Sequence, residues 1–416
     1  MTTSAPESAA PMVAPPEPEG DLRARMWQNV KGGNLGSWPV ILALAVIVVV
    51  FSQTANNFFT PGNFTNIITQ MAGTCLLAYG IVFVLLIGEI DLSVAFVSGV
   101  AGVVVAEAQL PNGAHLPWYL CVLLAILAAT AIGAFQGSIV ALIGVPSSVV
   151  TLAGFEIWQG VIQRTVPGVI VIQDPAINNF SNYLFPKGWW GPPWWVPGGW
   201  ALATGVSAMY VVAVLGSALS GRRHGIPVRS PFLLALKVIT VPVIAVTTVA
   251  ILNKDRGVPL ALLFVVGALL VWTFVAKQTT FGRHVYAVGG NAEAARRSGI
   301  NVHRIRILVF MISGAMSGLG GIVLAARLNS VDLNAGGGTL LIDAIAAAVI
   351  GGTSLFGGRG EIRNALIGAA MISTVANGMF ILGYSTGTIF IVTGAILLLA
   401  VTFDTVVRRL QARSGR

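Results

Sequence analysis

Carboxylates and amides that interrupt apolar runs are the residues of this chain best suited to chemistry. Glu89 and Asp91 close one long apolar run, and Glu156 and Asp343 lie within two others. A carboxylate at membrane depth is costly, so each one is a candidate to line a solute path or to couple an ion. With nearby hydroxyl and amide residues, the candidates for lining a path are Glu89, Asp91, Ser93, Thr151, Glu156, Gln159, Asp343, Thr353, Ser354 and Asn377.

Several of these candidates have an equally good structural interpretation. Glu89 and Asp91 can cap the N-terminus of a helix expected from residue 91, which explains them at least as well as gating does. Asp343 can cap its own helix or pair with Arg327 across the outer mouth. For these residues the sequence leaves both interpretations open.

The fifth and tenth apolar runs are crowded with Gly and Ser, so each is a candidate for a re-entrant or broken helix, and both carry polar residues. Glu156, Gln159 and Gln163 recur at three- and four-residue spacing, which places them on one helix face. That face must avoid lipid, so it either lines the path or seals one helix against another. Thr353 and Ser354 lie among glycines and predict a break in the tenth run, which is tolerated at depth only beside protein or water.

Catalysis, metal binding and nucleic-acid binding are not indicated. The four histidines are dispersed without metal-ligand spacing, and no nucleophile–base pair stands out. The positive charges lie between apolar runs and do not gather with aromatic residues. No G-x-x-x-x-G-K-[ST] motif is present to cradle phosphate, so we expect no cofactor in this chain and assign any use of ATP and Mg to a partner.

A charged stretch at residues 287–306, AVGGNAEAARRSGINVHRIR, stands between two apolar runs. Asn291 is a good N-cap residue and Gly299 a good C′ residue, so a helix of about two turns is predicted between them. Glu293 lies near the positive end of this helix and the arginines near its negative end, which favours the macrodipole. A helix this short is unstable alone and must pack against something.

Two roles for this short helix compete. A basic helix can lie on anionic lipid, but it would then need large apolar residues facing the membrane. Alanines stand there instead, and small residues suit close docking into a groove of a cytoplasmic partner. We therefore predict docking through Asn291, Glu293, Ala294, Ala295, Arg296, Arg297 and Gly299.

The elements that must position these residues are membrane helices. The 416 residues are 55% hydrophobic and only 9% charged, which leaves too few charges for a soluble surface. Runs long enough to span a bilayer predict an all-α polytopic membrane protein of about twelve spans, with ten as the alternative. The predicted spans are 38–53, 65–87, 91–109, 118–143, 148–164, 200–220, 232–252, 258–276, 307–326, 340–356, 364–382 and 387–404.

Charge predicts the orientation and the boundaries. With the N-terminus inside, most lysines and arginines fall in inside segments, which supports cytoplasmic N- and C-termini. The predicted parts are a disordered cytoplasmic tail (1–34), a membrane domain (35–404) that contains the charged segment 278–306, and a basic cytoplasmic tail (405–416). The tryptophan-rich outer loop at 185–200 suits either an interfacial aromatic belt or a docking platform.

A short internal repeat indicates two related halves. GEIDLSVAFVSGVAG at 88–102 and GEIRNALIGAAM at 360–371 both follow an apolar run and open a helix of small residues. Because many transporters are built from two inverted halves, we expect two pseudo-symmetric halves here.

Several motifs resemble the permease subunits of bacterial ABC importers for sugars, the ribose, xylose and arabinose group. LLIGEIDLSVAFVSG (85–99) and LIDAIAAAVIGGTSLFGGRGEIRNALIGA (341–369) resemble that family's two signatures, and VYAVGGNAEAARRSGINVHRIRI (285–307) resembles its cytoplasmic coupling segment. VPSSVVTLAG (145–154) is a fourth match. The span pair 200–252, with the LNKDRGVP that follows it, resembles the D-xylose branch.

The resemblance implies a function and partners. A member of that family is a multi-pass protein of the bacterial cell (inner) membrane and forms the path for a monosaccharide, here xylose or another pentose, without being an enzyme itself. It implies a second permease copy, a cytoplasmic ATP-binding subunit that couples through residues 289–300, and a periplasmic or extracellular sugar-binding protein, but no nucleic acid. The alternative is a secondary solute carrier that couples an ion through a carboxylate such as Glu156 or Asp343.

Departures from the family pattern bear on the cargo. Ala95 stands where the family usually has glycine, Leu341 where glutamate is frequent, Arg297 where leucine is usual, and Phe356 where a small residue is usual. Two of these changes, the missing carboxylate and the added phenylalanine, lie near the expected path and leave the identity of the sugar open.

Overall fold

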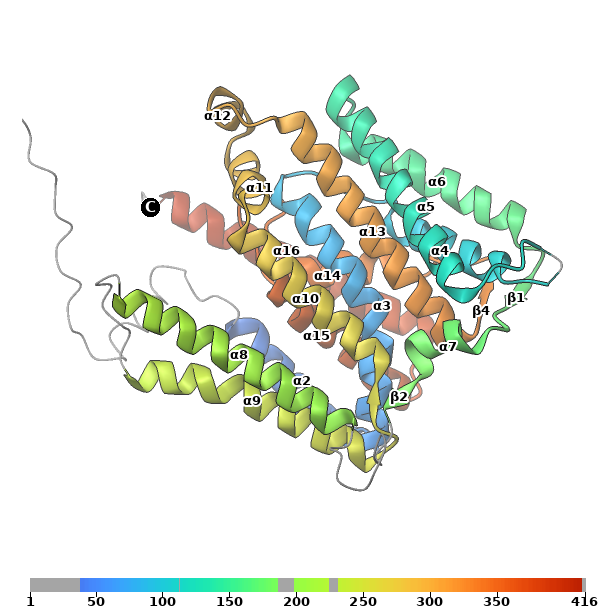
Figure 1. Cartoon of the computed structure of the whole chain (residues 1–416), viewed down its shortest axis with the longest axis horizontal. Helices are drawn as coiled ribbons and strands as arrows, with labels where there is room; N and C mark the ends of the chain where they lie inside the picture. The colour runs from blue at the N-terminus through green and yellow to red at the C-terminus, as the bar shows by residue number, and fades with distance from the viewer. Residues whose placement is uncertain (1–37, 112, 186–197, 224–230, 414–416) are drawn as a thin grey trace, which may run out of the picture.

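The computed structural model describes residues 38–111, 113–185, 198–223 and 231–413, and these form a bundle of long helices with a few short strands (Figure 1). The helices are α2 (Trp38–Thr54), α3 (Pro61–Leu86), α4 (Val94–Ala108), α5 (Trp118–Ser138), the π-helical turn η1 (Ile139–Ile143), α6 (Ser147–Thr165), α7 (Pro175–Asn182), α8 (Gly198–Arg223), α9 (Pro231–Lys254), α10 (Leu260–Gln278), α11 (Thr280–Gly290), α12 (Ala292–Arg297), α13 (Val302–Leu328), α14 (Leu340–Ile350), α15 (Ile362–Ile381) and α16 (Thr386–Arg413). The strands are β1 (Val169–Val171), β2 (Leu184–Phe185), β3 (Val258–Pro259) and β4 (Ser330–Asp332).

Each predicted span corresponds to a helix, and the polytopic helical class is confirmed. Among the described residues, seven helices are long and apolar enough to cross a membrane, and α2, α4, α14 and α16 contain shorter apolar stretches. The fifth predicted span is the continuous helix α6, so no break interrupts it. The number of spans and the side of each terminus stay predictions.

Helices α3 and α13 form the centre of the bundle (Figure 1). Of the most apolar 18-residue stretch of each helix, 83% is buried in α3, against 6% in α8 and 6% in α9. Glycine allows the helices to approach this closely: a Cβ built at Gly133 of α5 would lie 2.2 Å from the carbonyl oxygen of Phe310 in α13. In the reverse direction, a Cβ at Gly314 would lie 2.2 Å from the carbonyl oxygen of Ala129. Small residues at helix contacts are the usual way to gain packing in a membrane.

Two interruptions lie within the bundle. The first break, residues 87–93, separates α3 from α4, and the second break, residues 351–361, separates α14 from α15. The second confirms the break that Thr353 and Ser354 predict. The two Gly-Glu-Ile motifs do not occupy equivalent positions, because Glu361 is the N-cap of α15 whereas Glu89 lies inside the first break, ahead of the N-cap residue Ser93.

The bundle has one end formed by short helices and an opposite end that carries strands. Figure 1 shows α12 and the start of α13 at one end, and β1, β4 and α7 at the opposite end. At the strand end, β1 pairs antiparallel with β4, with Ile170 opposite Val331, and β2 pairs with β3. The Asn182 side-chain amide also donates to the Ala326 carbonyl at 2.6 Å. These two ladders add a little strand to the expected all-α fold. The β1–β4 ladder ties the segment after α6 to the segment that follows α13.

Helices α8 and α9 pack on each other at the edge of the bundle, and little of them is buried. Their outward side chains include Val212 and Ile244, exposed at 70% and 59%, which suits contact with lipid. The predicted boundary at residue 404 falls inside α16, which continues to Arg413. The predicted tail 1–34 and most of the tryptophan-rich loop lie outside the described residues.

Candidate functional site

The charged insert forms the predicted helix. Asn291 caps α12 by accepting a hydrogen bond from Ala294 N at 2.9 Å. Gly299 adopts φ +84°, and the amides of Gly299 and Ile300 donate to the Arg296 and Ala295 carbonyls at 3.0 and 3.1 Å. This pair of bonds is the Schellman ending in which C′ must adopt a left-handed conformation, so glycine is favoured there.

The surface of α12 divides into a packed side and a charged side. Ala295 is buried against the central core, whereas Arg296 and Arg297 have side chains exposed at 65% and 79%. Both arginines form ion pairs with Glu293 along the helix. Hydrogen bonding and charge from Arg296, reinforced by Arg297, hold the pKa of Glu293 below its usual range. The helix therefore presents a fixed row of charges outward.

A second helix, α11, precedes α12 and is absent from the sequence prediction. Thr279 caps it by accepting a hydrogen bond from Gly282 N at 3.2 Å. A threonine followed by a short amphipathic stretch is a helix-start signal that the sequence does contain. Together α11 and α12 make the insert a two-helix element that leads from α10 to α13.

A junction of glycines joins this element to both breaks. A Cβ at Gly289 of α11 would lie 1.7 Å from the Leu86 carbonyl oxygen, at the end of α3. The same oxygen accepts a hydrogen bond from Gly358 N at 2.9 Å. A Cβ at Gly357 would lie 2.8 Å from the Gly289 oxygen and 3.0 Å from Gly88 N. Three backbone segments thus meet with no side chain between them, and we call Gly88, Gly289, Gly290, Gly357 and Gly358 the glycine junction.

Polar contacts surround the glycine junction. The Tyr286 hydroxyl donates to the Gly360 carbonyl at 2.8 Å. Lys277 Nζ lies 2.8 Å from Glu361 Oε1, and Arg363 also pairs with Glu361. Burial acts to raise the pKa of Glu361, but the hydrogen bonds and charges of Lys277 and Arg363 together outweigh it and lower that pKa. These bonds hold the second break against α10 and α11.

Glu89 is held by an ion pair and does not cap α4. Its Oε1 lies 3.1 Å from Arg306 Nε, close enough for charge attraction, although the N–H is not aligned as a hydrogen bond. This contact joins the first break to the first turns of α13. The capping interpretation of Glu89 is therefore wrong.

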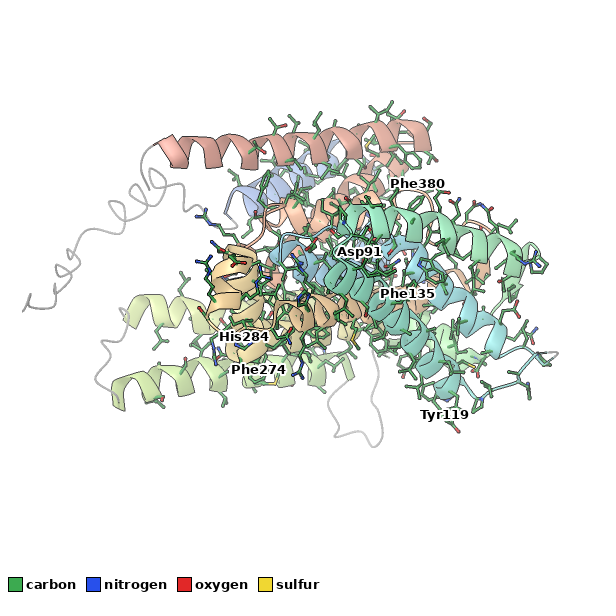
Figure 2. All side chains as sticks on the ribbon, turned by 90° about the horizontal axis from the view of Figure 1, so that it is seen from above. Asp91, Tyr119, Phe135, Phe274, His284 and Phe380 are labelled. Carbon is green, nitrogen blue, oxygen red and sulfur yellow. The ribbon has the colours of Figure 1, made fainter. Side chains whose placement is uncertain are left out.

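Asp91 forms the polar centre of the bundle. Figure 2 labels Asp91 near the middle of the bundle, and only 5% of it is exposed, against 62% of Phe135 and 74% of Phe380. One carboxylate oxygen accepts from Ser93 N and Ser93 Oγ at 3.0 and 2.7 Å, and the other accepts from Ser313 Oγ at 2.8 Å. Within the described ranges no cation pairs with it. Hydroxyls and the backbone amides of Ser93 and Val94 hold this carboxylate.

Ser93 extends the polar centre to α5. Its hydroxyl also lies 2.9 Å from the amide oxygen of Gln136, whose Nε2 has no partner within the described ranges. A hydroxyl has one proton, so Ser93 cannot donate to both neighbours at once. Turning the amide lets Gln136 Nε2 donate to Ser93, which then donates to Asp91. The resulting chain runs from α5 through the first break to α13.

The first break is also tied to α6. Ile90 N donates to Ser147 Oγ at 3.1 Å, and Thr151 Oγ1 lies 3.3 Å from the Ile90 carbonyl. Thr151 is fully buried and donates more closely to the Ser147 carbonyl, at 2.8 Å. Of the predicted residues, Asp91, Ser93 and Thr151 therefore come together around the first break.

The other predicted path residues lie in three further places. Thr353 and Ser354 are both buried at the second break. Ser354 Oγ accepts from Phe356 N at 3.0 Å, whereas the Thr353 hydroxyl has no hydrogen-bond partner among the described residues. Asn377 is buried in α15, and in the part of the chain that the structure describes its Oδ1 has no hydrogen-bond partner. Asp343 lies in the first turn of α14, and among the described residues no ion pair links it to Arg327.

Helix α6 carries the remaining pair. Glu156 is exposed on this helix, and Gln159, one turn further on, is half-buried beside a pocket near the start of α14. The alternative that this polar face seals helix against helix within one chain is therefore not supported for Glu156.

Sequence reasoning missed Gln136, Ser147 and Ser313. Gln136 and Ser313 are isolated polar residues in apolar runs, and Ser147 lies in the motif VPSSVVTLAG, which was the one signal that could have found it. In the described part of the chain, no cluster of three or more His, Cys, Asp or Glu side chains is placed to hold a metal ion.

Comparison with known proteins finds relatives that match most of this chain. Residues 63–401 match the family described as branched-chain amino acid transport system / permease component. The chain is 36% identical over 391 residues to the xylose transport system permease protein XylH of Escherichia coli strain K12, across 92% of this chain and 95% of that protein. It is 34% identical over 390 residues to XylH of Haemophilus influenzae, across 91% and 98%.

A ribose permease is similar as well. The chain is 32% identical over 364 residues to the ribose import permease protein RbsC of Escherichia coli strain K12, across 88% of this chain and 92% of that protein. No solved structure matches this chain. The family match covers most of this chain, and these relatives are matched along nearly their whole length. This chain therefore belongs to the branched-chain amino acid transport system permease family.

Proposed function

We propose that this chain is the transmembrane permease of an ATP-driven importer for a monosaccharide in the bacterial inner membrane. The observation that carries the proposal is the capped, outward-charged helix α12, fixed through α11 to two breaks inside a membrane bundle. The similarity to XylH and RbsC supports a sugar as cargo, and the higher identity to XylH supports xylose or another pentose.

The first partner is a cytoplasmic ATP-binding subunit that binds α12. The exposed Arg296 and Arg297 offer charge, and the exposed Ala294 leaves room for a groove wall to approach. A displacement of α12 reaches both breaks through the glycine junction, where backbone contacts backbone. ATP and Mg act in that partner and not in this chain.

The second partner is another copy of this chain. Glu156 and Gln163 are exposed on α6, which lies at the edge of the bundle in Figure 1. A bare carboxylate in the middle of a membrane helix is costly against lipid. A second copy that covers this face would remove that cost and would place Glu156 and Gln159 along a shared path.

The third partner is a sugar-binding protein at the opposite end of the bundle. The β1–β4 ladder and the Asn182 contact hold this end in a defined shape, as a docking surface requires. An ion-coupled secondary carrier is not favoured, because the family is one of transport-system permease components. Uptake by this chain alone in an ion gradient would favour the carrier again.

Reconstitution tests the proposal. The chain, an ATP-binding subunit and a sugar-binding protein in liposomes should take up labelled D-xylose only with ATP. Reversing the charges with Arg296→Glu and Arg297→Glu should abolish this uptake while leaving the bundle folded, because both side chains point away from the core. Lys254→Glu, which reverses the charge of an exposed lysine at the end of α9, away from α12 and α6, serves as the control. Normal uptake by the double variant would overturn the coupling role of α12.

A further inference from the structure

A small pocket opens between α4, α6 and the turn that leads into α14. Its volume is about 220 Å³, and its lining comprises Phe96, Phe155, Gln159, Asn334, Gly336, Gly337, Gly338 and Leu341. Phe155 follows Gly154, whose backbone packs on Gln136 and Ser93 of the polar centre. The pocket therefore adjoins the polar centre, on the side of it that faces the strand end.

Two aromatic rings form one wall. Phe96 and Phe155 meet edge to face, with centroids 4.6 Å apart and planes at 81°. Phe96 is 4% exposed, so the surrounding core fixes its position. The face of an aromatic ring carries partial negative charge and attracts the weakly positive C–H groups of a sugar ring.

Amides and bare backbone complete the lining of the pocket. Gln159 lies one helical turn after Phe155, so both face the same side of α6. Its amide and that of Asn334 each offer a donor and an acceptor, as a hydroxyl does. Gly336 and Gly338 have φ of +82° and +68°, and a Cβ at Gly336 would lie 2.2 Å from the Ala95 carbonyl oxygen. The turn thus requires glycine and leaves its backbone on the wall.

The volume and the uncharged lining of the pocket limit which ligands can fit it. The volume equals that of roughly seven water molecules, which suits one sugar ring and not two. No charged side chain lines the pocket, so neither an anion nor a cation is favoured. Few polar groups and a small contact area give weak binding, which a transport path needs in order to release its cargo.

We propose that this pocket is a weak subsite for one neutral monosaccharide, in which Gln159 and Asn334 bond its hydroxyls and Phe155 packs on its ring. The assignment rests on the proposed function and deepens it. It also gives the half-buried Gln159 a role that packing alone does not supply.

Thiol labelling tests the subsite without relying on transport. The two native cysteines, Cys75 and Cys121, are buried and free, so the background is low. Gln159→Cys in the purified full-length chain is treated with a small water-soluble thiol reagent, with D-xylose or with sucrose, which is too large for the pocket. Leu333→Cys is the matched control, because Leu333 is exposed in the same turn region but does not line the pocket.

D-xylose at twice its Kd should slow labelling at position 159 about threefold, and sucrose should not. Labelling at position 333 should be unchanged. An unaffected rate at position 159, or equal slowing at both positions, would overturn the subsite. Asn334→Cys repeats the test at a second lining residue, outside α6, so a misfolded Gln159 variant does not decide it. Import by the unmodified complex is measured separately, so the subsite can fail while the importer stands.

Discussion

The two breaks are held by different kinds of hydrogen bond. The first break is held by side chains: Asp91 bonds to Ser93 and Ser313, and Ile90 bonds to Ser147 and Thr151. The second break is held largely by its own backbone, with Ser354 N donating to the Arg359 carbonyl at 2.9 Å, and by glycines with positive φ. Its outward bonds run to α10 and α11.

This difference indicates that the two breaks are attached to different parts of the molecule. Side-chain bonds from α5, α6 and α13 fix the first break within the membrane helices. The second break is fixed instead to the helix that leads into α12. We therefore expect a displacement of α12 to move the second break relative to the first, with the Leu86–Gly358 hydrogen bond at the boundary between them.

The largest effect should come from filling the glycine junction. Gly289→Ala would place a Cβ 1.7 Å from the Leu86 carbonyl oxygen, so backbone must shift, which costs about 1–3 kcal/mol or more. We expect ATP-driven uptake to be lost and the thermal unfolding midpoint of the purified chain to fall. Gly290→Ala is the matched control, because a Cβ there meets nothing within 4 Å. Equal behaviour of the two variants would contradict the junction.

The second-largest effect should come from removing the Asp91 carboxylate of the first break. Asp91→Ala leaves the hydroxyls of Ser93 and Ser313 buried without their partner, at a cost of about 1–3 kcal/mol. Asp91→Asn keeps an acceptor for Ser93 and can donate to Ser313, so it should unfold close to the parent midpoint. If Asn destabilised as much as Ala, the charge itself and not the hydrogen bonding would hold the first break.

Loosening the second break should have a moderate and selective effect. Tyr286→Phe removes one hydrogen bond to the Gly360 carbonyl, worth about 1 kcal/mol. We expect the fold to persist and the number of sugars imported per ATP hydrolysed to fall. Uptake and hydrolysis that stay in their parental ratio would show that this bond does not contribute to coupling.

The smallest effect should come from the exposed ion pair. Lys277→Ala removes a contact whose side chains are 38% and 31% exposed, so it contributes at most about 1 kcal/mol, and Arg363 remains beside Glu361. The pKa of Glu361 is lowered on folding, so its contribution is present above its usual pKa of 4.5 and is lost as pH falls through the lower folded value. Unfolding midpoints should differ slightly at neutral pH and converge in acid.

Local signals predicted the parts of the site that are local. Asn291 and Gly299 fix α12 through bonds within one short segment, and the threonine and glycines of the second break act within a few residues. The partners of Asp91 could not be found in this way. Ser313 lies 222 residues further along the chain, and its hydroxyl has no pattern that points back to position 91.

Other parts of the site depend on tertiary packing. Gly289 appears in the sequence as one of a pair with Gly290, yet of the two only Gly289 would direct a Cβ into another backbone. Glu89 and Asp91 stand two residues apart, yet one forms an ion pair with Arg306 and the other is enclosed by hydroxyls. Helix packing decides these outcomes, and no local propensity encodes them.

Cross-linking from α12 tests the central claim most directly. A cysteine in place of Arg297, whose side chain is 79% exposed, is reacted with a short bifunctional reagent in the assembled importer. We predict a covalent product with the ATP-binding subunit, and none from a cysteine in place of Arg164 at the other end of α6. A product from position 164 with that subunit, or none from position 297 in a complex that imports sugar, would contradict the account.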